Sequence, residues 1–395
     1  QVDLADRPDA PPAWAAPPDP APGPPADPVV EQVRVAIGTL GGVVEVSGSR
    51  RTGCALPGAD LDLVAALPGT VDPSAVEAAV RSAVPGARAF RHVVGARVPG
   101  LRFRVGPPDA GLGVDLATVA TGSVPPASAV ARRAELGEPA AVVLSAVSDA
   151  TAILAAVGHR CPAFTDLART VKAWARARGL DSAPHGGLPG VAWAVLAART
   201  VIDTGAQPHE FFGSWALWDW RTPVAIGTGG EPTGPVTVLT PSAPVRSCTE
   251  QVTAGFRDLL AEELYRAWEL TAGDATSSEL LTPPPLHDRH AAWAVLTAEP
   301  TGSATLDVVV GRLRGRTRAL LAVLADAGIT DAHAWPRPVE AGPEVTRYAV
   351  GLGRTPPDAT RLAALTGEWA AGVPGVRVDR ASSPHEFSRA ARSVR

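Results

Sequence analysis

The chain has 395 residues, of which 46% are hydrophobic and 19% are charged, and its formal net charge is −4. Its length predicts two or three domains, and its slightly negative charge excludes a protein that is strongly basic overall. Three widely separated cysteines exclude a disulfide framework or a CxxC zinc site. We see no apolar run as long as a membrane span and no secretory signal, so we expect a cytoplasmic protein with no membrane partner.

Residues 1–28 are dominated by Pro, Ala and Asp. Because Pro interrupts helices and sheet ladders, this composition predicts a disordered linker. The chain contains no Met, so we expect it to be part of a longer polypeptide. Otherwise we expect a monomer.

Residues 29–126 alternate between helical and strand patterns, which predicts a mixed α/β unit. Helices are expected at 29–40, where apolar residues recur at helical spacing before two glycines, and at 72–85, which begins with Asp-Pro-Ser. The expected strands are short apolar or alternating runs at 43–46, 60–67, 88–98, 101–105 and 112–119.

Residues 127–285 are expected to be mostly helical, with an irregular, Trp-rich stretch at 205–240. The expected helices are 140–158, 164–178, 189–204 and 248–270. A Thr-Pro-Pro-Pro run at 282–285 predicts a boundary. Beyond it, alternating strands and helices predict a small α/β sandwich, with elements at 291–298, 311–327, 346–352 and 358–371. The whole chain is therefore expected to be a multidomain α+β protein.

Segment 47–63 has the strongest chemical signal. Gly48-Ser49 is placed at the end of one strand, and Asp60 and Asp62 alternate on the next, so both carboxylates project from the same face. Paired carboxylates repel each other unless a cation lies between them, and oxygen ligands of this kind suit Mg²⁺ or Mn²⁺. Asp115 is the best third ligand, because it stands alone in an apolar strand. A lone Asp-x-Asp is more often a solvated strand end, whereas this combination favours a two-metal site.

This pattern, Gly-Ser followed by Asp-apolar-Asp and a later Asp, resembles that of the DNA polymerase β-type nucleotidyltransferase superfamily. Further segments resemble eukaryotic-type poly(A) polymerases in chain order, at 164–199, 211–224, 239–244, 262–271 and 293–298. The chain is identified as a member of this family, and its Arg- and Ala-rich composition favours a bacterial member.

The resemblance implies three domains. They are a polymerase-β-like nucleotidyltransferase domain, a helical central domain that closes over the nucleotide, and an RRM-like α/β sandwich that binds RNA, at 29–126, 127–285 and 286–395. It also implies that Asp60, Asp62 and Asp115 are the catalytic metal ligands.

On the nucleotide side, the resemblance places Gly48, Ser49 and Lys172 against the triphosphate. Lys172 is the single Lys in a chain that otherwise uses Arg, and a compact ammonium fits where a forked guanidinium does not. Val191, which follows Gly190, matches the valine that packs on the adenine ring.

The expected activity is template-independent addition of AMP from ATP to an RNA 3′ hydroxyl, with release of pyrophosphate by a two-metal mechanism. Two alternatives stay open. One is another RNA terminal nucleotidyltransferase that adds CCA or uridine or repairs RNA, and the other is a catalytically weak RNA-binding module of a larger protein.

Some positions depart from the family. Asp181 and Ala183 replace the family's Tyr and Asn, which leaves nucleotide selectivity and catalytic rate open. Ser145 stands where the family has an Asn. Alternating arginines in the expected helix 311–327 suit either a phosphate-binding patch or a solvated surface, at Arg312, Arg314, Arg316 and Arg318.

Overall fold

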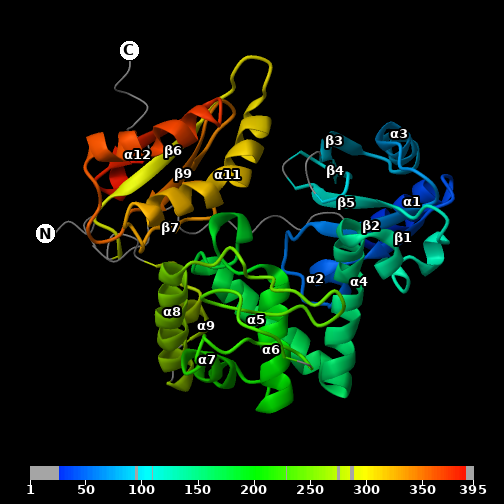
Figure 1. Ribbon diagram of the computed structural model, residues 1–395, viewed down its shortest axis with the longest axis horizontal. Coiled ribbons are helices and arrows are strands. Elements are labelled where there is room, and N and C mark those ends of the chain that lie inside the picture. Colours follow the sequence, from blue (N-terminus) through cyan, green and yellow to red (C-terminus); the bar gives the residue numbers. More distant parts are fainter. Residues whose placement is uncertain are drawn as a thin grey trace, which may run out of the picture.

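The computed structural model describes residues 26–387, except 94–96, 109, 228, 274–275 and 285–288. Residues 1–25 of the predicted linker lie outside the described residues, and residues 26–28 belong to the first helix instead. The elements form three groups in chain order, an N-terminal sheet with its helices, a helical middle part and a C-terminal sheet with its helices. Figure 1 shows the two sheets above the helical part, one on each side.

The N-terminal sheet has the strand order β1-β2-β5-β4-β3, in which β2 and β5 are parallel and the other neighbours antiparallel. The predicted strands all form, as β1 Val43–Val46, β2 Leu61–Leu67, β3 Ala87–Val93, β4 Gly100–Val105 and β5 Leu112–Ala120. Both predicted helices also form, as α1 Ala26–Gly38 and α3 Pro73–Ala83.

The two faces of this sheet differ, because side chains alternate along each strand. Leu61 and Leu63 of β2 share a core with α1 and α3. Val64 and Ala66, on the opposite face, pack instead on helix α4 Glu138–Val157 of the helical part. Asp62 alternates with these residues, so it lies on the face that is turned toward the helical part.

The helical part contains α4 Glu138–Val157, α5 Cys161–Ala177, α6 Gly190–Asp203, α7 Pro208–Ala216, α8 Ala254–Ala272 and α9 Ser277–Leu280. The stretch 205–240 was predicted to be irregular, which was wrong at the helix α7. Pro208 occupies the first turn of α7, and Gln207 and Glu210 form a capping box. Trp215 and Trp220 are buried in the core of this part. The helix predicted at 248–270 begins only at Ala254, after the Thr253 N-cap.

One apolar stretch is longer than expected. By length and composition alone, the region Glu138–Ala177 could cross a membrane, so the prediction that no such stretch exists was wrong. More than half of its most apolar window is buried inside the protein, and the core helix of a folded protein passes the same test. A turn at Gly158–Arg160 separates α4 from α5.

The C-terminal group has the element order β-α-β-β-β-α-β, and its antiparallel sheet is ordered β10-β6-β9-β7 with the short β8 paired to β9. Without β8, this is the ferredoxin-like arrangement. The four predicted elements form as β6 Trp293–Ala298, α11 Leu306–Asp326, β9 Thr346–Gly351 and α12 Ala359–Ala371. Three strands were missed, β7 His333–Ala334, β8 Glu340–Ala341 and β10 Val376–Ala381. Two of these are too short to show a period, and β10 is rich in charge.

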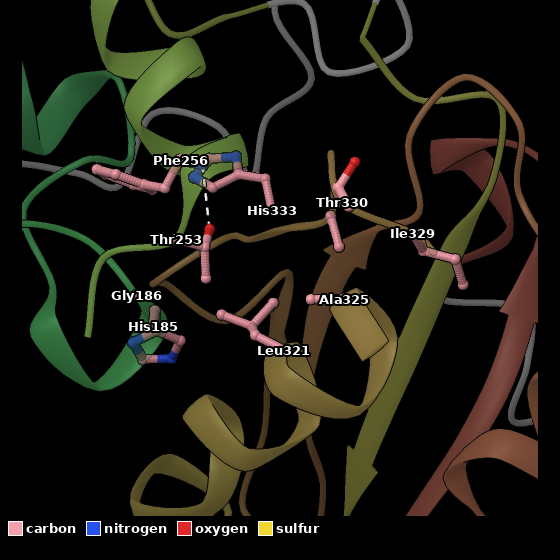
Figure 2. Close-up of a pocket in the computed structure, with 10 residues that line it drawn as sticks. His185, Gly186, Thr253, Phe256, Leu321, Ala325, Ile329, Thr330 and His333 are labelled. Carbon is pink, nitrogen blue, oxygen red and sulfur yellow. Dashed lines mark hydrogen bonds between the residues drawn. The ribbon is translucent and has the colours of Figure 1, made fainter. Parts of the chain in front are cut away.

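Buried histidines hold the C-terminal group against the helical part. His333 Nε2 donates to the Gly179 carbonyl oxygen at 3.1 Å. Burial lowers the pKa of His185 to about 4 and of His333 to about 3, so both are neutral at pH 7. The cavity that they line with Phe256 and Leu321 is about 10 Å³, room for at most one water molecule (Figure 2). These histidines therefore act as packing groups between the two parts.

Candidate active site

The three predicted carboxylates gather on one face of the N-terminal sheet. Asp62 on β2 and Asp115 on β5 are direct register partners on neighbouring parallel strands. Asp60 directly precedes β2 and alternates with Asp62. Alternation in the sequence predicted that Asp60 and Asp62 share a face. The position of Asp115 beside Asp62 depends on the strand order, in which β5 lies next to β2.

Two glycines leave room for these carboxylates. A Cβ on Gly113 would lie 2.1 Å from Asp60 Oδ1, and a Cβ on Gly48 would lie 2.5 Å from Asp62 Oδ2. Gly48 also has a φ of +61°, a conformation that L side chains rarely adopt. Sequence reasoning missed Gly113, although its place two residues before Asp115 puts it on the same face.

The predicted place of Gly48-Ser49 at a strand end was wrong. The strand β1 ends at Val46, and Gly48 and Ser49 begin the one-turn helix α2 Gly48–Arg51. The left-handed φ of Gly48 turns the chain out of the extended conformation. Ser47 N donates to the Asp62 carbonyl oxygen at 2.9 Å and so ties this turn to β2.

The carboxylates repel one another. Burial raises the pKa of Asp62 to about 6, with smaller contributions from Asp115 and Asp60. The Asp115 carboxylate accepts from Arg102 of β4, whose Nη2 lies 2.7 Å and Nε 2.9 Å from Oδ2. Among the described residues, no group of three His, Cys, Asp or Glu is close enough to hold a metal ion. The fold thus brings the three predicted ligands to one face, but Arg102 holds one of them.

A cleft of about 290 Å³ opens between the N-terminal sheet and the helical part. It is lined by most of the predicted site residues, namely Gly48, Ser49, Asp62, Lys172, Gly190 and Val191. Asp60 and Asp115 share the sheet face of Asp62 but do not line the cleft. Lys172 Nζ donates to the Cys54 carbonyl oxygen at 3.0 Å, and burial lowers the pKa of the ammonium.

Sequence reasoning missed a polar group that lines the same cleft. Asp149 of α4 is 3% exposed, and its Oδ1 accepts from the Ser242 amide at 3.0 Å and from the Ser242 hydroxyl at 2.5 Å. Arg246 Nη1 donates to Ser145 Oγ at 3.0 Å and to the Pro244 carbonyl oxygen at 3.3 Å. These residues come from α4 and from a loop about a hundred residues later, so no local pattern could have paired them.

Asp181 does not line the cleft. Its carboxylate pairs with Arg337 of the C-terminal group at 3.2 Å. Arg337 also donates to the Arg176 carbonyl oxygen. The negative charge of Asp181 is therefore neutralised by the C-terminal group. Ala183 begins a short 3₁₀ turn, Ala183–His185.

The glycine beneath Asp60 gives a first prediction. Gly113→Ala should lower metal-dependent activity by roughly 10²-fold, because the new Cβ displaces the Asp60 carboxylate by an ångström or more. The melting temperature should change little, since the atom that must move is the end of a side chain. Gly315→Ala on α11, where a Cβ meets nothing within 4 Å, is the control. Full activity in Gly113→Ala would exclude Asp60 from the site.

No family model matches the chain. Among curated proteins it is 28% identical over 123 residues to a poly(A) polymerase of Entamoeba histolytica, a match that covers 28% of this chain and 24% of the relative. It is 31% identical over 144 residues to a poly(A) polymerase of Dictyostelium discoideum, covering 30% of this chain and 18% of the relative. The matches span about a quarter or less of these relatives' own length.

Solved structures with a similar arrangement include the Cid1 poly(U) polymerase with MgGTP bound, at 12% identity and a TM-score of 0.49, covering 65% of this chain and 91% of that chain. Another is mtPAP in complex with UTP, at 11% identity and a TM-score of 0.46, covering 65% of this chain and 67% of that chain. At these scores the likeness supports no argument about this chain.

Proposed function

We propose that the chain is a template-independent RNA 3′-end nucleotidyltransferase of the DNA polymerase β-type superfamily. Its distant and partial similarity to poly(A) polymerases supports this proposal. In this reaction the RNA 3′ oxygen attacks the α-phosphate of a nucleoside triphosphate, a new phosphodiester bond forms and pyrophosphate leaves. The observation that supports the proposal is the cleft in which Asp62, Ser49 and Lys172 meet.

We propose that Asp60, Asp62 and Asp115 hold the divalent ions of this reaction, Mg²⁺ or Mn²⁺. Such ions, when bound, lower the pKa of the attacking hydroxyl and neutralise the triphosphate. The donors are the oxygen ligands that such ions prefer, and a cation would offset the burial and repulsion that raise the pKa of Asp62. With Arg102 on Asp115, the described residues form no group that is close enough to hold a metal ion.

The remaining cleft residues serve the nucleotide in this proposal. The Ser49 hydroxyl and amide can donate to phosphate oxygens, and the absence of a side chain at Gly48 keeps that approach open. The Lys172 ammonium lies in the same cleft and supplies a compact positive charge. A bound polyanion would raise the pKa of Lys172 again and so keep the ammonium charged.

We propose ATP as the nucleotide on the basis of the resemblance, with Val191 packed on the base. One observation favours a second candidate, uridine or guanosine addition. Arg246 lines the cleft, and a guanidinium can only donate hydrogen bonds. Uracil and guanine offer it carbonyl oxygens, whereas adenine presents an amino group beside its ring nitrogens.

Incubation of a radiolabelled RNA primer with each of the four NTPs and Mg²⁺ tests both candidates. We expect primer extension that is fastest with ATP. Fastest extension with UTP or GTP, together with a shift toward ATP in Arg246→Leu, would support the second candidate. Calorimetry that shows RNA binding but no NTP–Mg²⁺ binding would instead identify a non-catalytic RNA-binding module.

We also propose that the C-terminal group is RRM-like in topology but not in its use of the sheet. RRM sheets stack bases on aromatic side chains of their open face. Here the face away from α11 and α12 is buried, with Trp293 and Val295 in a small core and the Trp335 ring against Gly179. RNA contact then falls to the exposed α11 arginines, Arg312, Arg314, Arg316 and Arg318.

A further inference from the structure

A row of arginines continues the sheet face that bears the carboxylates. On β4, Arg102 stands opposite Asp115 and Arg104 opposite Gly113, so both arginines share that face. On β3, Arg91 stands opposite Arg102. Like charges directly opposite each other destabilise a sheet. Arg91 already pairs with Asp307 of α11, and Arg104 donates to the Gly111 carbonyl oxygen. A bound anion would therefore act mainly on Arg102 and Arg104, immediately beside the three carboxylates.

Arg102 is the member of this row that touches the site. Both its Nε and its Nη2 donate to Asp115 Oδ2, at 2.9 and 2.7 Å. The Arg102 side chain is 62% exposed and that of Asp115 is 33% exposed. An ion pair so open to water is weak, and a guanidinium bonds to a phosphate at least as well as to a carboxylate. Arg102 can therefore change partner at little cost.

We propose that Arg102 is a positioning residue that couples RNA binding to assembly of the metal site. In the free protein Arg102 holds the Asp115 carboxylate. When an RNA strand lies on the arginine row, one of its phosphates takes Arg102, and Asp115 becomes available to the divalent ion beside Asp62 and Asp60.

The anion is an RNA phosphate rather than the nucleotide, because Arg102 does not line the cleft that holds Ser49 and Lys172. The inference rests on the proposed function, since it assigns Asp115 to a metal site. By linkage, the coupling must act in both directions, so the metal ion also strengthens RNA binding by the same factor.

The test measures Mn²⁺ binding to the full chain. The electron paramagnetic resonance signal of free Mn²⁺ reports the unbound ion. The titration is done with and without an RNA oligonucleotide that ends in a 3′-deoxy nucleotide. Arg102→Leu should bind Mn²⁺ about fivefold more tightly than the parent without RNA, because no guanidinium competes for Asp115. Added RNA should strengthen Mn²⁺ binding in the parent and have little effect in Arg102→Leu.

Arg104→Leu is the matched control for the measurement without RNA, because it removes the same charge from the same exposed strand face two residues away and does not touch Asp115. Arg102→Gln gives a second, polar variant with the same expectation as Arg102→Leu. Equal Mn²⁺ affinity in the Arg102 and Arg104 variants would overturn the inference while leaving the metal site standing. If Asp62→Ala binds Mn²⁺ as tightly as the parent, the proposed metal site itself is wrong.

Discussion

Replacing Asp60 and Asp62 together by Ala is expected to abolish metal-dependent nucleotide incorporation, a loss on the order of 10³-fold or more. The pair supplies two of the three carboxylates on the cleft side of the sheet, and the third, Asp115, is paired with Arg102. With both removed, Asp115 alone remains, and Arg102 occupies its carboxylate. Primer extension with Mg²⁺ and with Mn²⁺ measures the loss.

The fold of this double variant should remain intact. Burial and neighbouring negative charge oppose the ionised form of Asp62 in the folded protein, so its loss relieves repulsion. The melting temperature without metal should therefore equal or exceed that of the parent. Asp326→Ala, at the exposed end of α11, is the control and should keep full activity. If the double variant still incorporates nucleotides, the assignment of the site is wrong.

Glu263→Gln is expected to produce the largest loss of stability, about 3–5 kcal/mol in the free energy of unfolding. Glu263 of α8 is 1% exposed, and its carboxylate receives Arg178 Nε at 2.5 Å and Nη2 at 2.8 Å. Arg289, which leads into the C-terminal group, pairs with the same carboxylate. Without the Glu263 carboxylate, the two largely buried guanidinium groups of Arg178 and Arg289 lack their common counter-charge. Urea denaturation followed by tryptophan fluorescence measures the change.

Glu262→Gln is the control for this prediction, because the neighbouring Glu262 is exposed and should shift the free energy of unfolding by less than about 0.5 kcal/mol. The two variants remove the same charge at adjacent positions on α8. If their urea midpoints coincide, the buried ion pairs of Glu263 contribute nothing to the free energy of unfolding.

The sequence alone predicted most of the helices and strands, because their residues carry a local period. The apolar spacing of α1, the alternation around Asp62 in β2 and the Asp72 N-cap of α3 each predict the element in which they lie. The elements that were missed have no such signal. The strand β7 is two residues long, and α7 begins at a Pro that serves as the first turn of a helix.

For the candidate site, the sequence singled out the residues, and the tertiary structure decided their partners. Asp60, Asp62, Asp115 and Lys172 stand out from the sequence because each is a charge in an unusual local setting. The side chains that contact these residues depend on strand order and on helix packing. The register of β4 against β5 sets Arg102 on Asp115, and the docking of the C-terminal group sets Arg337 on Asp181. Contacts between residues far apart in the chain leave no local period, so only the folded protein reveals them.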